Sequence, residues 1–191
     1  MSLNYGEIVR ENLIEQLNKN LNSEVKVGDI KVSSWKKIPF FSLEFKDVLI
    51  LEPKNYAPSP DTLFFLEQVY FQFDLWDIYN GNYNLKEVEI EGGDVRMKVN
   101  ESGVFNYIFW KESTDTSSTN FQLQLKRISL SNVQYLYDDR EVDFSIEAQV
   151  DQMNLNGDFD ETSFELKYVG NISSVNIIAQ GSKVVNDVDL I

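Results

Sequence analysis

The stretch LKEVEIEGGDVRMKVNESGVFNY, residues Leu85–Tyr107, contains a pattern that recurs in this chain. Its first seven residues resemble FKDVLIL at Phe45–Leu51 and LKRISLS at Leu125–Ser131. Each copy has an apolar residue, a lysine, a charged residue and then apolar residues at alternate positions, and the lysines are 40 residues apart. A spacing of this size predicts a repeat architecture, in which each unit buries its apolar face by stacking on its neighbours.

The composition favours β structure and excludes several classes of function. Aromatic residues make up 13% of the 191 residues, and such residues are enriched in strands. The net charge of −14 argues against binding to nucleic acid and against docking on anionic lipid head groups. Because the chain has no histidine and no cysteine, catalysis by Cys-His or Ser-His-Asp groups and thiolate or imidazole metal sites are excluded. We therefore expect a protein that is not an enzyme, with no catalytic residue, no metal site and no cofactor.

Alternating apolar residues predict a mainly β fold, a curved antiparallel sheet of repeated hairpins that forms an open groove. The alternation in residues 24–35 changes parity at Gly28-Asp29, and the same change recurs between Leu130 and Val133. A change of parity indicates a β-bulge or a tight turn, and repeated bulges would curve the sheet.

The other expected strands follow from alternation and from turn residues. Two glycines at Gly92-Gly93 favour a turn between two strands. The expected strands are 40–51, 63–74, 83–91, 94–100, 121–130, 133–137, 142–155, 162–169 and 172–180, followed by a last run from Lys183.

Two segments differ from this pattern. Residues 4–21 predict an amphipathic helix, which either packs on the sheet or closes one of its ends. Residues 111–120, KESTDTSSTN, are small and polar and predict a linker or loop between a first region at 4–110 and a second at 121–191. The alternation continues to Ile191 without a capping element, so we expect this chain to be a piece of a longer protein.

The strand LFFLEQVYFQFD at 63–74 carries a strongly apolar face in which Glu67 is the exception to the parity. One interpretation is a face that packs in a closed core, and the other is the open wall of a groove that holds acyl chains. The candidates for that wall are Leu63, Phe65, Val69, Phe71, Phe73, Val88 and Ile90.

Three other groups of residues have weaker interpretations. Asn154, Asn156, Asp158, Asp160 and Glu165 have the spacing of calcium ligands in an EF-hand, but Phe159 replaces the required glycine, so an acidic turn is the better account. Asp138–Glu141 predicts a charged hairpin tip rather than an acid/base pair. The aromatic residues at 105–110 are typical of a core, with a sugar or peptide platform as the alternative.

The order of these features resembles the N-terminal part of AsmA-like proteins over residues 8–145. The clearest part is the pattern of a strand, a glycine, a second strand and then Asn100, Gly103, Asn106 and Tyr107. Other similar segments are Glu24–Ser33, Pro39–Ile50, Leu66–Tyr83 and Leu130–Asp139. The chain departs from the family in its length and in lacking a membrane helix.

The resemblance implies a non-enzymatic envelope protein at the periplasmic face of the inner membrane of a Gram-negative bacterium. It implies an N-terminal membrane anchor that this chain lacks, envelope protein partners and a role in outer-membrane biogenesis. By analogy with TamB and chorein-like bridge proteins, that role is lipid transport, the conduction of phospholipid acyl chains along a β-groove. The alternatives are a β-rich interaction or scaffold module that pairs through an edge strand, and a carbohydrate- or calcium-binding module.

Overall fold

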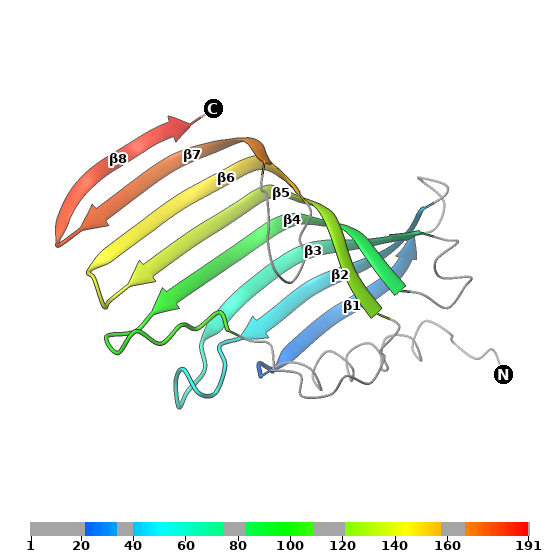
Figure 1. The fold of residues 1–191 in the computed structure, drawn as a ribbon, viewed down its shortest axis with the longest axis horizontal. Coiled ribbons are helices and arrows are strands. Elements are labelled where there is room, and N and C mark those ends of the chain that lie inside the picture. The colour runs from blue at the N-terminus through cyan, green and yellow to red at the C-terminus, as the bar shows by residue number, and fades with distance from the viewer. Residues whose placement is uncertain (1–21, 34–39, 75–82, 109–120, 158–166, 191) are drawn as a thin grey trace.

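The computed structural model describes residues 22–33, 40–74, 83–108, 121–157 and 167–190, and they form a single open sheet (Figure 1). Its eight strands lie side by side in chain order, with β1 and β8 at the two edges. The strands are β1 (Val25–Ser33), β2 (Phe40–Leu51), β3 (Thr62–Asp74), β4 (Tyr83–Val99), β5 (Phe121–Asp139), β6 (Phe144–Asn156), β7 (Lys167–Ala179) and β8 (Ser182–Leu190). The mainly β fold is confirmed, and the predicted helix at 4–21 lies outside the described residues.

Neighbouring strands are antiparallel except β4 and β5, which are parallel. The expectation of a sheet built from hairpins throughout is therefore wrong at this pair. Parallel neighbours cannot be joined by a tight turn, because the chain must return to the other end of the sheet. The predicted linker at 111–120 lies within this crossover and outside the described residues, and strands from both predicted regions belong to the same sheet.

The period of 40 residues is the register of the parallel pair. Val88 lies beside Ile128, and Val95 lies beside Tyr135. The second and third copies of the repeat are thus neighbours in space. The first copy does not follow the same frame. Lys46 directly precedes the interruption at Asp47, whereas Lys86 precedes the interruption at Gly92 by several residues and lies itself at a register shift between Leu85 and Glu87.

One residue in each strand from β1 to β7 interrupts the ladder at a similar level of the sheet. We call these residues the bulge row. Residues on either side of the row are paired across the strands, as Val27 is with Val48 and Val48 with Leu66. The members of the bulge row are Gly28, Asp47, Glu67, Gly92, Asn132, Asp151 and Ser174.

The local sequence explains why several strands bulge at this level. Asp47 has a φ of 51°, Gly92 of 74° and Asn132 of 53°, all in the left-handed region. Glycine, asparagine and aspartate enter this region at the lowest cost, because the first lacks Cβ and the other two have short polar side chains that bond locally. At Asp47, Gly92 and Asn132 the bulge row therefore has residue types that tolerate a left-handed backbone.

The bulges also correct the expected strand boundaries. Gly92-Gly93 is not a turn, because β4 continues through it from Tyr83 to Val99. In the same way β5 continues through 130–133, and β7 is one strand where two were expected at 162–169 and 172–180. The bulge interpretation is confirmed at Gly28 and near Asn132. A bulge changes the side-chain parity while the strand stays paired, and alternation alone does not distinguish it from a turn.

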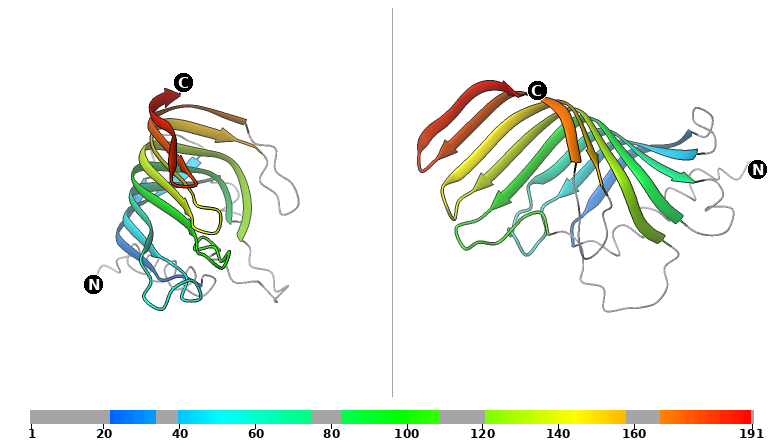
Figure 2. Two further views of the ribbon diagram at one scale, coloured as in Figure 1. Left: turned by 90° about the vertical axis from the view of Figure 1, so that its left-hand side faces the viewer. Right: turned by 45° about the horizontal axis from the view of Figure 1, so that its top comes forward.

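The change of parity keeps apolar side chains on one face of every strand. On this apolar face, the residues that flank the bulge row are almost fully buried, with exposed fractions of 7% for Val48, 1% for Val133 and 6% for Val150. The bulge residues Asn132 and Asp151 are exposed instead. In a single layer this difference places the apolar face on the inner side of the curvature that Figure 2 shows.

The most buried part of the apolar face spans β1 to β3. Phe45 is 3% exposed, Val69 is 2% exposed, and the Phe45 ring meets that of Phe71 edge-on with centroids 5.0 Å apart. Burying a side chain of this size stabilises the fold by roughly 1.5–3 kcal/mol. The buried cluster consists of Val25, Val27, Leu43, Phe45, Val48, Leu66 and Val69.

We predict that Gly93→Ala destabilises the protein by about 3 kcal/mol or more. Gly93 has a φ of 132°, and a Cβ there would lie 2.2 Å from the backbone oxygen of Phe65 on the adjacent strand. The control is Gly181→Ala, which has a φ of 70° but open space around its Cβ. Urea unfolding measures both variants, and equal losses of stability would contradict the steric role assigned to Gly93.

Candidate functional site

Four of the seven residues predicted to line a groove lie together on the apolar face. Val69 is paired with Ile90, and Phe71 is paired with Val88, on adjacent strands β3 and β4. Val69 belongs to the buried cluster, and the other three are partly buried against it. The structure therefore brings these four side chains into one continuous apolar surface.

The remaining three candidates have other positions. Phe65 lies on the outer face, opposite the apolar face, because the bulge at Glu67 changes the parity of β3. Leu63 is fully buried beside a register shift at the start of β3, outside the main cluster. Phe73 is paired with Phe41 and Leu85, and its side chain is not among those described.

The structure places Phe64 and Leu66 on the apolar face in place of Phe65. The signal that identifies them was present in the sequence, since Glu67 breaks the parity of an otherwise apolar series. Such an exception marks the residue at which the two faces exchange.

The apolar face continues across β5, β6 and β7, where no residue was predicted to line a groove. Ile128 is paired with Leu155, and Leu130 is paired with Met153, on the far side of the bulge row from Val133 and Val150. The alternation of these strands is visible in the sequence, but the register that joins them to β4 is not. Further members of this surface are Ile146, Ile172 and Ile177.

Tyrosines gather on the apolar face near the β5–β6 hairpin. Tyr137 donates a hydrogen bond to Asp139 Oδ2 at 3.1 Å. Burial, Asp139 and the nearby Tyr107 hydroxyl raise the pKa of Tyr137 to about 12. The Tyr107 ring contacts Phe105, with centroids 5.2 Å apart, and the Tyr137 ring contacts Phe144. Phe105 is 39% exposed, so the group of aromatic residues at 105–110 that was predicted to form a core is partly exposed to solvent.

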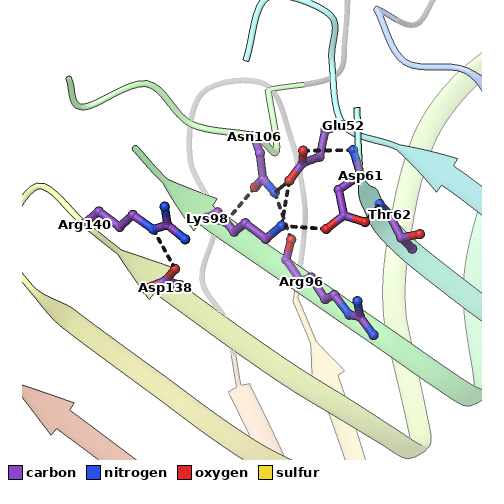
Figure 3. A network of polar contacts seen from close by, with 8 residues as sticks. All are labelled: Glu52, Asp61, Thr62, Arg96, Lys98, Asn106, Asp138 and Arg140. Atoms are coloured by element: carbon purple, nitrogen blue, oxygen red, sulfur yellow. Dashed lines mark hydrogen bonds and ion pairs between the residues drawn. The ribbon is translucent and has the colours of Figure 1, made fainter. Parts of the chain in front are cut away.

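A polar clamp joins the loop after β2 to β4 and to the loop that follows β4 (Figure 3). It consists of Glu52, Asp61, Lys98 and Asn106. The side chain of Glu52 is 2% exposed and accepts hydrogen bonds from Lys98 Nζ at 3.0 Å and Asn106 Nδ2 at 3.0 Å. Its other oxygen accepts from the Asp61 backbone N–H at 3.1 Å. The buried carboxylate is therefore paired and fully hydrogen-bonded, as a buried charge must be.

Asn106 holds the loop after β4 against the edge of that strand. It is fully buried, its Oδ1 accepts from the Lys98 backbone N–H at 2.7 Å, and its Nδ2 also donates to the Arg96 carbonyl. Asn100 shapes the loop by accepting from the backbone N–H groups of Ser102 and Val104. Gly103 supplies a left-handed residue with a φ of 74°. The Asn100, Gly103 and Asn106 pattern thus has a structural role here.

The outer face carries a shallow hollow of about 560 Å³ across β4 to β7. Asp94, Arg96, Gln134, Glu147 and Gln149 contribute to its lining. Mixed polar side chains of this kind are typical of the solvated side of a sheet, so we assign no chemistry to this hollow.

The remaining predicted groups of residues have simple structural positions. Asp138–Glu141 forms the predicted hairpin tip, where Asp139 Oδ1 accepts from the Glu141 backbone N–H at 3.0 Å. Asn154 and Asn156 lie exposed on β6, and the other three residues with EF-hand spacing lie outside the described residues. Across the described ranges, no group of three acidic side chains is arranged to hold a metal ion, and no helix has the length and apolarity to cross a bilayer.

Comparison of the chain with protein-family models gave no match, and comparison with curated proteins gave none either. The geometry of the apolar face and the chemistry of its residues therefore carry the functional argument.

We predict that Lys98→Met destabilises the protein by about 3–5 kcal/mol, because the Glu52 carboxylate would remain buried without its cation. In the double variant Glu52→Gln/Lys98→Met no charge is stranded, so part of the loss is recovered. Urea unfolding of the two single variants and the double variant gives the coupling energy. Additive losses would show that Glu52 and Lys98 do not act as a pair.

We also predict a pH dependence from Asp61. The Thr62 backbone N–H and then Lys98 lower the pKa of Asp61 below its ordinary value. A lowered pKa in the folded state gives stability that is present at neutral pH and is lost as the pH falls through the carboxyl range. Asp61→Asn is expected to be less stable than the wild type at pH 7, and the deficit is expected to be smaller at pH 3, measured as urea midpoints. An equal deficit at both pH values would contradict this role of the charge.

Proposed function

We propose that this chain is a non-enzymatic segment of a bacterial envelope protein that holds phospholipid acyl chains in outer-membrane biogenesis. The observation that carries the proposal is the unbroken apolar face of an open, curved sheet. Within the ranges that the structure describes, neither a helix nor a second sheet lies over this face.

The face suits a flexible hydrocarbon chain better than a rigid polar ligand. It is lined by aliphatic and aromatic side chains on neighbouring strands, such as Phe71, Val88 and Ile128. Each methylene group removed from water contributes about 0.8 kcal/mol, so a long acyl chain binds without any specific polar contact. An open groove of this kind holds the acyl chains while the head groups stay in water.

The resemblance to AsmA-like proteins supports the cellular setting of the proposal. It favours the periplasmic face of the inner membrane of a Gram-negative bacterium, reached through an N-terminal anchor. The residues that carry the clearest part of the resemblance, Asn100, Gly103 and Asn106, build the loop beside β4. This agreement between motif and local structure supports the family hypothesis, and lipid transport follows from that hypothesis.

The test compares two phenylalanines on the same strand but on opposite faces. We expect Phe71→Asn to fold and to lose the phospholipid that co-purifies with the wild type, because it places an amide on the apolar face. Phe65→Asn is the matched control on the outer face, and it is expected to retain the lipid. Native mass spectrometry after mild extraction detects the lipid, and urea unfolding reports the fold.

A second variant decides the case if Phe71→Asn does not fold. Leu130 is a partly buried residue of the apolar face outside the buried cluster and its packed neighbours, so Leu130→Asn costs less stability. Loss of lipid from folded Leu130→Asn supports the proposal. A wild-type protein without lipid, or folded variants that keep it, would overturn the proposal.

The edge strand β8 favours a second candidate, a scaffold that docks by strand addition. Val184 is 65% exposed and Val188 is 42% exposed on a strand that is paired only with β7 in the described part of the chain. An exposed edge can take up a further strand through its backbone groups. Lipid-free protein that forms dimers, and loses them on Val188→Asp, would support this candidate instead.

A further inference from the structure

Tyr135 places a hydroxyl group in the apolar face of the sheet. It is paired with Val95 on β4 and with Ala148 on β6, and all three belong to the apolar face. Its hydroxyl contacts Met97 Sδ at 3.8 Å. A thioether is a weak acceptor, so most of the hydrogen-bonding capacity of this phenol is unused.

The neighbouring tyrosine differs from Tyr135 in this respect. Tyr137 donates to the carboxylate of Asp139, so its proton already has a strong acceptor. Tyr135 instead lies among uncharged side chains, those of Val95, Met97 and Ala148, with the Tyr107 phenol also nearby. Burial raises the pKa of Tyr135, so its hydroxyl remains a neutral donor at physiological pH.

A neutral donor in apolar surroundings selects a neutral acceptor. A carboxylate or phosphate placed there would lose its hydration without gaining a cation, which is costly. An ester carbonyl has no charge and is joined directly to an acyl chain. Ala148, the residue paired with Tyr135 on β6, has a small side chain.

We propose that the Tyr135 hydroxyl donates a hydrogen bond to the ester carbonyl of a glycerolipid whose acyl chain lies on the apolar face. This inference rests on the proposed function and adds the position of the ester to it. The acyl chain extends from Tyr135 over the apolar face, away from the β5–β6 hairpin. The glycerol and head group then lie toward the β5–β6 hairpin.

The experiment separates binding of the chain from recognition of the ester. Methyl palmitate and an alkane of the same length compete with a fluorescent alkane probe for the delipidated protein. The wild type is expected to bind the ester more tightly than the alkane. Tyr135→Phe is expected to lower ester affinity by about threefold to tenfold, the effect of one hydrogen bond, and to leave alkane affinity unchanged.

Tyr70→Phe is the matched control. Tyr70 lies on the outer face, where its hydroxyl donates to Gln68 Oε1 at 2.6 Å, and we expect this variant to bind both ligands like the wild type. If Tyr135→Phe keeps the ester preference of the wild type, the proposed hydrogen bond from Tyr135 to the ester is overturned, while the proposal of acyl-chain binding stands. If the wild type binds neither ligand, the proposed function is overturned, and the proposed hydrogen bond from Tyr135 to the ester is overturned with it.

Discussion

The structure depends on the placement of one extra residue in successive strands at a shared level. If the parity of the sequence changed without an extra residue in the backbone, the apolar side chains beyond the change would turn to the outer face. In this sheet each strand from β1 to β7 changes parity in the bulge row, so Val48 and Phe45 both point to the apolar face although they are three residues apart. The bend and the continuous apolar face therefore have the same cause. From β1 to β6 the interruptions align, so pairing resumes on both sides of the row, whereas Asp151 and Ser174 lie at different levels and the register of β6 and β7 shifts.

The apolar face and the end of β4 are stabilised by different kinds of interaction. On the apolar face, stability comes from burial of aliphatic and aromatic groups, which is non-directional and tolerates an open surface. At the end of β4, stability comes from the polar clamp, in which Glu52 has defined partners in Lys98, Asn106 and the Asp61 backbone. A buried ion pair adds less net energy than its contacts suggest, but loss of one partner is severe. The clamp therefore fixes the position of the loop after β4 more than it strengthens the core.

The sequence predicted the strand locations well and their pairing less well. The bounds of β2 were predicted as observed, because Phe40–Leu51 alternates and ends at Pro53. Gly92-Gly93 is wrongly predicted as a turn, because a pair of glycines is compatible with both a turn and a bulge. Only the pairing with the adjacent strand distinguishes a turn from a bulge. The parallel pairing of β4 with β5 was hidden for a similar reason. The period of 40 residues is visible in the sequence. It shows which residues of the two strands are equivalent, but it does not show whether the strands run parallel or antiparallel.

For the candidate site too, the sequence predicts less well those features that depend on how the strands pair. Val69, Phe71, Val88 and Ile90 were identified by alternation, and alternation is reliable between bulges. Phe65 was placed on the wrong face because the effect of Glu67 depends on whether the strand bulges or simply tolerates a polar residue. Tyr135 carried no signal of its own, since a tyrosine in a strand is ordinary. Its position on the apolar face becomes visible only when the register places it between Val95 and Ala148.

Burial on the apolar face is not confined to the β1–β3 cluster. Val133 is 1% exposed and Val175 is 5% exposed, although both lie far from the β1–β3 cluster. Val188 on the edge strand is 42% exposed, since it has a neighbour on one side only. Burial on the apolar face therefore decreases toward the edge strand β8.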